Sequence, residues 1–283
     1  MGHHPGTPIF SPEYTAVASE LPVLGVSFSW DVLETEIDWL NQAGRDLEVS
    51  ASPAILDNDQ PARVERAKRL FDGFGGRLSI HAPGGVRTAT DDPLEREFTR
   101  TRFHQAIDFA NAIGATHMVV EPWLFSFSNA TILPGHMPRM ADLSYGTLQP
   151  LVAHAEDKNV TLVLENVPEV FPHLLIDLVR RFESPNVRMC LDTGHAYLMH
   201  HQHGAPVPDE WVRQAGDLLA HLHVADNDGE MDRHWGPGDG EIAWYPLFQR
   251  LNELTTMPRL ILELPPERAR RGVNYFTAAG FAR

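Results

Sequence analysis

Short apolar segments alternate with longer amphipathic segments along most of the chain. The apolar segments are rich in aliphatic and β-branched residues, as buried parallel strands are. They occupy residues 22–28, 46–50, 77–82, 116–121, 160–165, 187–192, 219–224 and 259–264. Between them, apolar residues recur at three- and four-residue steps, which predicts amphipathic helices. These helices are expected at 31–43, 62–74, 95–113, 142–158 and 172–182, with shorter ones at 209–217, 244–254 and 267–282.

Eight strand-like segments with helices between them predict a (β/α)8 TIM barrel, an α/β fold, rather than a doubly wound sheet. The chain has 283 residues, and a barrel of about 250 residues commonly forms one domain. We therefore predict a single barrel domain over 21–283, preceded by a flexible arm over 1–20 that lacks any periodicity. Long loops are expected at 122–140 and 225–241, on the face where barrel enzymes carry their catalytic residues.

The overall charge and composition argue against several classes of protein. Lys plus Arg is 23 and Asp plus Glu is 38, which gives a formal net charge of −15 and disfavours a nucleic-acid partner. The single cysteine allows no intrachain disulfide, which fits a reducing compartment. We find neither a signal peptide nor an apolar run of about 20 residues. The sequence therefore predicts a soluble cytoplasmic protein without membrane contact.

Side chains that can bind metal stand at the carboxyl ends of six predicted strands. The third to sixth predicted strands end in His81, Glu121, Glu165 and Asp192, the seventh contains His221 and His223, and the eighth contains Glu263. Because a closed barrel brings these strand ends to one mouth, we expect the side chains to meet there. Gathered carboxylates repel one another, and a divalent cation relieves that repulsion. This ligand set suits Zn, Mn or Fe, and its many carboxylates also admit Mg.

Each of these residues also has a simpler interpretation. A single His or Glu at a strand end is usually a capped or solvated side chain, but six at successive strand ends are harder to explain in that way. Strand alternation places His221 on the same face as His223, so both could face inward. In the loop that follows, Asp232 and His234 could bind one cation together, although Asp- and Gly-rich segments are usually plain turns. The histidines at 200, 201 and 203 predict a solvated loop.

The motifs at these strand ends resemble those of the xylose-isomerase-like barrel superfamily. This superfamily includes sugar-phosphate isomerases and epimerases and the endonuclease IV group. The matching segments follow the order of the family from about residue 22 to about residue 265. They are SIHAP (79–83), LEN (164–166), DTGH (192–195), HVADN (223–227), DRH (232–234), GPGDG (236–240) and LE (262–263).

The isomerase branch of this superfamily implies roles for five residues. The resemblance implies one metal ion bound by Glu165, Asp192, His223 and Glu263. It also implies that Glu165 and Glu263 flank the substrate carbon and move its proton. His195 is then expected to contact the substrate.

The endonuclease branch implies a larger metal site. It binds three zinc ions, and its pattern adds positions that match His81, His195, Asp232 and His234. That branch has a histidine where this chain has Glu121, and a glutamate can still bind metal.

Three functions follow from these observations. The first is a metal-dependent isomerase or epimerase of a sugar or sugar-like polyol ketone, acting by proton transfer next to a carbonyl held by the metal. The second is a multinuclear metal-dependent phosphoester hydrolase that acts on a small phosphodiester. The third is a barrel that binds a small-molecule ligand without turnover. A homo-oligomer is compatible with all three.

Overall fold

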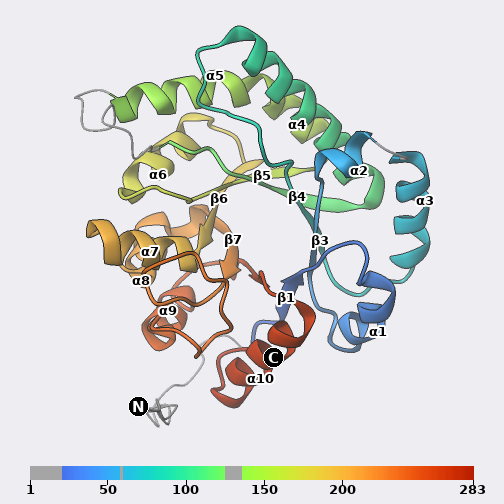
Figure 1. Ribbon diagram of the computed structural model, residues 1–283, viewed down its shortest axis with the longest axis vertical. Helices are drawn as coiled ribbons and strands as arrows, with labels where there is room; N and C mark the ends of the chain where they lie inside the picture. Colours follow the sequence, from blue (N-terminus) through green and yellow to red (C-terminus); the bar gives the residue numbers. More distant parts are fainter. Residues whose placement is uncertain (1–20, 58–59, 125–135) are drawn as a thin grey trace.

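Eight parallel strands close into a barrel, as the alternating pattern predicts. The computed structural model describes residues 21–57, 60–124 and 136–283. The strands are β1 (Leu24–Ser27), β2 (Leu47–Ser50), β3 (Leu78–His81), β4 (Ala115–Val120), β5 (Thr161–Glu165), β6 (Val187–Asp192), β7 (Leu219–Val224) and β8 (Arg259–Leu262). Each strand pairs with the next along the chain, and β8 pairs with β1 to complete the barrel. In Figure 1 the strands lie at the centre and the helices surround them.

The helices in the described ranges cover the outside of this barrel. They are α1 (Leu33–Ala43), α2 (Pro53–Asp57), α3 (Gln60–Leu70), α4 (Pro93–Ile113), α5 (His136–Asp157), α6 (Pro172–Arg181), α7 (Thr193–His203), α8 (Pro208–Ala215), α9 (Trp244–Leu251) and α10 (Pro266–Ala278), with a 3-10 turn, η2 (Gly216–Leu218), before β7. Within these ranges, no helix combines the length and the apolar character that crossing a membrane requires.

Local sequence signals set the ends of α4. The Asp92 side chain accepts hydrogen bonds from the backbone N–H groups of Leu94 and Glu95, at 2.8 and 3.4 Å, and Pro93 occupies the first turn. Both residues are favoured at the start of a helix. The Asp side chain accepts hydrogen bonds from backbone N–H groups that have no partner in the helix, and proline has no N–H group that would need one. At the other end Gly114 adopts a φ of 80°, a left-handed conformation that glycine accepts without strain.

Two segments differ from the predictions. Helix α5 begins at His136, so the last part of the loop predicted at 122–140 is helical, while 125–135 lies outside the described residues. The prediction of a solvated loop at 200–203 was wrong, because these residues form the last turn of α7. That helix has no amphipathic pattern, and it is started instead by the Asp192 side chain, which accepts from the His195 N–H at 2.6 Å. The predicted arm at 1–20 also lies outside the described residues.

Candidate metal centre

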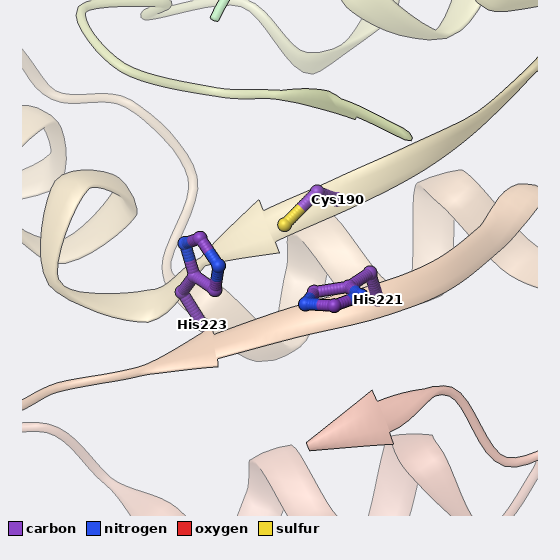
Figure 2. A group of neighbouring side chains, drawn as sticks. All are labelled: Cys190, His221 and His223. Carbon is purple, nitrogen blue, oxygen red and sulfur yellow. The ribbon is translucent and has the colours of Figure 1, made fainter. Parts of the chain in front are cut away.

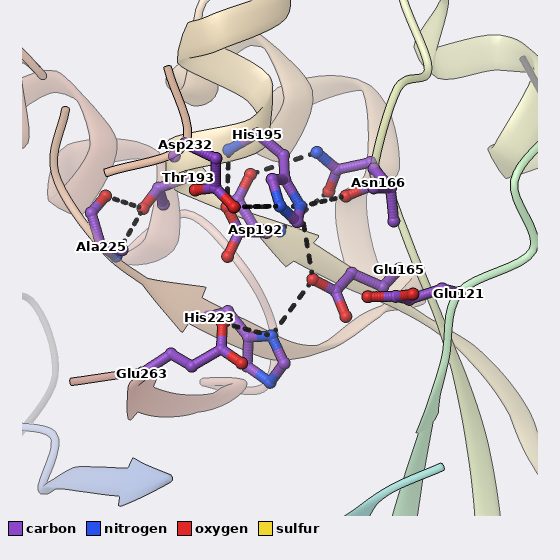
Figure 3. Close-up of polar contacts among 12 residues, drawn as sticks. Glu121, Glu165, Asn166, Asp192, Thr193, His195, His223, Ala225, Asp232 and Glu263 are labelled. Atoms are coloured by element: carbon purple, nitrogen blue, oxygen red, sulfur yellow. Dashed lines mark hydrogen bonds and ion pairs between the residues drawn. The ribbon is translucent and has the colours of Figure 1, made fainter. Parts of the chain in front are cut away.

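The ends of β5, β6, β7 and β8 bring four of the predicted ligands to one place at the barrel mouth (Figure 3). The Nδ1 atom of His223 lies 3.2 Å from Glu165 Oε1 and 3.7 Å from Glu263 Oε2. One ligand atom each from Asp192, His223 and Glu263 lie within 4.8 Å of one another. Glu165, Asp192 and His223 are buried, whereas 27% of the Glu263 side chain is exposed. The centre therefore opens to solvent on the Glu263 side.

Asn166 fastens the ends of β5 and β6 beside this centre. Its side-chain amide donates to the Asp192 carbonyl oxygen at 3.1 Å, and its side-chain oxygen accepts from the Asp192 N–H at 2.8 Å. The Asp192 carboxylate also caps α7. The end of β6 is thus held by Asn166 on the side of β5 and by the start of α7 on the other, which fixes the backbone beside the predicted ligands Glu165 and Asp192.

The other predicted ligands extend the cluster on both sides of Glu165. On one side, His195 Nδ1 lies 3.5 Å from Glu165 Oε1, and His195 Nε2 lies 3.4 Å from Asp232 Oδ2. His234 Nε2 lies 3.1 Å from that same Asp232 oxygen. On the other side, His81 Nε2 lies 3.7 Å from Glu165 Oε2 and 3.8 Å from Glu121 Oε1. All nine predicted site residues therefore belong to one connected cluster of contacts.

Two buried carboxylate oxygens in this cluster fit a cation. Glu165 Oε2 and Asp192 Oδ2 are buried, and no described residue offers either of them a hydrogen bond. An unpaired buried polar atom is costly, and native structures rarely leave one without a partner such as an ion. Glu165, Asp192, His223 and Glu263 supply the carboxylate and imidazole donors that Zn, Mn and Fe accept. The residues present therefore fit a divalent metal.

The two glutamates beside His223 have pKa shifts in opposite directions. Burial acts to raise the pKa of Glu165, but the charge of His223 and hydrogen bonds from His195 and His223 hold it well below the usual range. Burial raises the pKa of Glu263, and the negative charges of Glu165 and Asp192 add to that effect against the charge of His223. Environments that separate the pKa values of two carboxyl groups are typical of acid–base pairs.

The surrounding imidazoles are held in their charged form by the carboxylates. Although burial lowers the pKa of His81, the nearby Glu165 carboxylate raises it to about 10. The hydrogen bond to Asp232 raises the pKa of His234 to about 9. The pKa of His223 is also raised well above its usual value, because the charge of Glu165 outweighs burial. Since metal ligands must be deprotonated, a cation entering this cluster would release protons.

Glu48 is a buried site residue that the sequence analysis missed. It lies on β2 with no exposed surface, and its Oε1 atom is 3.0 Å from His223 Nε2. Burial acts to raise the pKa of Glu48, but the charge of His223 and the close contacts with His221 and His223 hold it well below the usual range. The available signal was a charged residue inside a strand otherwise predicted to be buried.

The loop between β7 and α9 is organised by Asp226. Its Oδ1 atom accepts from the backbone N–H groups of Asn227 and Ile242 at 3.0 and 3.1 Å. Its Oδ2 atom accepts from the Gly238 N–H and the Trp244 indole at 2.9 and 3.2 Å. This buried carboxylate thereby fixes the loop that carries Asp232 and His234, and it is a second residue whose role the sequence analysis missed.

A cavity of about 590 Å³ adjoins the metal centre. His81 and Glu121 belong to both the cavity wall and the ligand cluster, and the wall continues through Gly84, Arg87 and Trp123. The indole N–H of Trp123 donates to Glu121 Oε2 at 3.0 Å, and about half of the Trp123 residue surface is exposed. The volume is within the usual range of about 300–1,000 Å³ for small-molecule sites.

A family model described as a xylose isomerase-like TIM barrel matches residues 37–279. The chain belongs to this family. The match covers every predicted ligand of the centre and all strands except β1. The family resemblance seen in the motifs is thereby confirmed, together with the closed barrel.

Three curated proteins are similar to this xylose isomerase-like chain. An uncharacterized protein of Methanocaldococcus jannaschii is 25% identical over 204 residues, which cover 69% of this chain and 66% of that protein. The D-psicose 3-epimerase of Enterocloster bolteae is 29% identical over 122 residues, 41% of this chain and 37% of the epimerase. The probable endonuclease 4 of Mesomycoplasma hyopneumoniae is 22% identical over 202 residues, 64% of this chain and 69% of that protein. The alignments span less than two thirds of each of the first two relatives.

Solved structures of similar proteins share the barrel over nearly its full length. A D-tagatose 3-epimerase-like protein superposes with a TM-score of 0.76 and 22% identity, covering 91% of this chain and 96% of that one. A Thermus thermophilus protein soaked with ZnCl2 superposes with a TM-score of 0.73 and 26% identity, covering 92% and 99%.

Proposed function

We propose that this xylose isomerase-like chain is a divalent-metal-dependent isomerase or epimerase of a sugar or sugar-like polyol ketone. The observation that carries the proposal is the placement of Glu165 and Glu263 on either side of His223 at the barrel mouth (Figure 3), 3.2 and 3.7 Å from its Nδ1 atom. Inversion at a carbon requires one group to take a proton from one face and another to return a proton to the opposite face. Two carboxyl groups that flank one ligand position meet that requirement.

The proposed ligands are Glu165, Asp192, His223 and Glu263, with Mn, Zn, Mg or Fe as the cation. When bound, such a cation supplies a positive charge that polarises a carbonyl and stabilises negative charge developing beside it. Glu165, the carboxylate with the lowered pKa, would take the proton from the carbon next to that carbonyl. Glu263, on the other side of His223, would return one to the opposite face. His195, largely enclosed beside Glu165, would hold a substrate hydroxyl.

The cavity and one relative support a sugar-sized substrate. The cavity of about 590 Å³ begins at His81 and Glu121, so a substrate held there would reach the metal centre directly. The relative from Enterocloster bolteae is named a D-psicose 3-epimerase, and its alignment includes 122 residues of this chain. We therefore infer a ketose or a related polyol ketone as the substrate class.

A direct test is deuterium exchange into ketoses. The protein, loaded with Mn²⁺ or Zn²⁺, would be incubated in D2O with D-psicose, D-tagatose and D-fructose, and NMR would follow deuterium entry next to the carbonyl and the appearance of an epimer. Glu165→Gln should abolish both signals, because the amide cannot accept the proton. Glu97→Gln is the control, since the side chain of Glu97 is 73% exposed on α4. Exchange that persists in Glu165→Gln would refute the assignment.

Phosphoester hydrolysis is the second candidate, and a specific observation favours it. His81, Glu121, Asp232 and His234 flank the four proposed ligands with further metal-binding atoms, which is more than one metal needs. The similarity to a probable endonuclease 4 agrees with this interpretation. Two or three Zn or Fe per chain, with cleavage of bis(p-nitrophenyl) phosphate and no exchange into ketoses, would establish hydrolysis instead.

A further inference from the structure

The barrel interior beneath the metal centre contains charged side chains where aliphatic ones are usual. The interior of such barrels is normally filled by layers of branched aliphatic residues. Here Val119, Val163 and Cys190 form one small apolar cluster, but Glu48 and His221 occupy the same interior with no exposed surface. A buried carboxylate is costly unless well-placed partners compensate it. Its partners therefore indicate what it does.

Glu48 reaches across the barrel from β2 to two histidines of β7. Its Oε1 atom lies 3.0 Å from His223 Nε2, and its Oε2 atom lies 3.2 Å from His221 Nε2. His221 Nδ1 in turn lies 3.3 Å from His117 Nδ1, one step further from the mouth. The carboxylate of Glu48 thus lies between His221 and the proposed metal ligand His223, and the contact with His223 is the one that has hydrogen-bond geometry.

The two ring nitrogens of His223 have different surroundings. Nδ1 faces Glu165 and Glu263 in the metal centre, whereas Nε2 faces Glu48. Because a carboxylate only accepts hydrogen bonds, the metal-free His223 carries a proton on Nε2 toward Glu48 and another on Nδ1 toward Glu165. A cation that takes the place of the Nδ1 proton would leave the Nε2 proton held by Glu48, so Nδ1 is the atom that can bind it.

We propose that Glu48 is a positioning residue that fixes the tautomer and the ring orientation of His223 for metal binding. This inference rests on the proposed metal centre. Histidine ligands commonly donate their second N–H to a carboxylate, and loss of such a partner typically lowers metal affinity about 10- to 100-fold. His221 Nε2 lies 3.2 Å from the second oxygen of Glu48 without hydrogen-bond geometry, so the hydrogen bond to this carboxylate comes from His223.

A second metal ion beneath the first is the competing interpretation of the same residues. Figure 2 shows Cys190, His221 and His223 on the neighbouring strands β6 and β7, and one ligand atom from each lies within 4.8 Å of the others. An ion there would have to take His223 Nε2 away from Glu48. All three side chains have 0% exposed surface, so a cation would also need an opening of the barrel to enter. The hydrogen bond with Glu48 explains the position of His223 without displacing Glu48 and without opening the barrel.

The test compares metal affinity among Glu48 variants, a Ser79 variant and the wild type, by competition for Zn²⁺ and Mn²⁺ with a chromophoric chelator. Glu48→Leu should bind about 10- to 100-fold more weakly, because His223 loses its acceptor. Glu48→Gln should bind more tightly than Glu48→Leu, because its side-chain oxygen still accepts from His223. Ser79→Ala is the matched control: Ser79 is also fully buried, lies beside Glu48 in the register of β2 and β3, and donates to the Leu47 carbonyl.

Histidine NMR separates positioning from a general loss of packing. Long-range ¹H–¹⁵N spectra of the zinc-loaded wild type should show His223 protonated at Nε2 and unprotonated at Nδ1. Glu48→Leu should lose the hydrogen-bonded Nε2 proton signal, while Ser79→Ala should retain it. If Glu48→Leu does not fold, Glu48→Asp replaces it, since the shorter side chain withdraws the acceptor and should give the same loss of signal and affinity.

Three outcomes would separate the role of Glu48 from the inner metal site and from the proposed function. Unchanged metal affinity in folded Glu48→Leu would overturn the inference, even for an enzyme that epimerises ketoses. A second equivalent of zinc that disappears in Cys190→Ser but persists in Glu48→Leu would replace it with the inner metal site. Affinity that depends on Glu48, in a protein that exchanges no ketose proton, would leave the inference standing and remove the proposed function.

Discussion

Replacing Asp226 by asparagine should destabilise the protein through the loop that carries Asp232 and His234. The buried carboxylate of Asp226 accepts two hydrogen bonds on each of its oxygens, from three backbone N–H groups and one indole. In the D226N variant, one of these oxygens is replaced by an NH2 group that points at two donors. Those two donors therefore lose their acceptor while they stay buried.

The size of the effect follows from that count. A buried donor left without a partner costs roughly 1–3 kcal/mol, so two of them should lower the free energy of unfolding by about 2–6 kcal/mol. Urea unfolding of the metal-free protein, followed by circular dichroism, measures this change. Asp177→Asn is the control, because the exposed Asp177 pairs with Arg180 at 3.6 Å on the surface of α6, and the loss of that pair should cost under about 1 kcal/mol.

The same substitution should also weaken the metal centre, because the loop positions Asp232 and His234 beside His195 and Glu263. A D226N protein whose unfolding free energy lies within about 0.5 kcal/mol of the wild type would refute the reasoning. It would mean that the four hydrogen bonds of Asp226 do not hold the loop in solution.

Three further predictions concern the centre and its cavity. The pKa of His234 is raised to about 9, so protonated His234 stabilises the metal-free fold fully below its ordinary pKa near 6.5, and this stabilisation is lost as the pH rises through 9. Thermal unfolding in EDTA should therefore show a melting temperature that falls over this pH range. Saturating Zn²⁺ should suppress the fall. Trp123→Ala should lower kcat/KM for a ketose about 10-fold, mainly through KM, because it removes an apolar wall of the cavity; an unchanged KM would place the substrate elsewhere. His81→Asn should leave one metal per chain by elemental analysis if the protein is an epimerase, whereas loss of a zinc ion would favour the multinuclear hydrolase.

Much of the fold and most of the centre could be predicted from the sequence alone. Buried parallel strands are continuous apolar runs and the outer helices are amphipathic, so the two periodicities separate cleanly. Once eight such pairs predict a barrel, the residues that end its strands must share one mouth. Glu165 and Asp192 therefore needed no contact information to be grouped, whereas His223 was chosen over His221 from the family resemblance. Helix α7 was missed because its start depends on a side-chain cap and its residues carry no periodic pattern.

Only the tertiary structure decided which polar residues lie at which depth of the barrel. His221 and His223 share a face of β7, and strand alternation cannot distinguish them. The register of β6 and β7 does so, because it sets His223 level with Asp192 and His221 level with Cys190, one layer below. Glu48 precedes its partner His223 by 175 positions, and β2 reaches β7 only across the closed barrel. Side-chain periodicity reports which way a residue faces, whereas the stagger between strands sets its height and its neighbours.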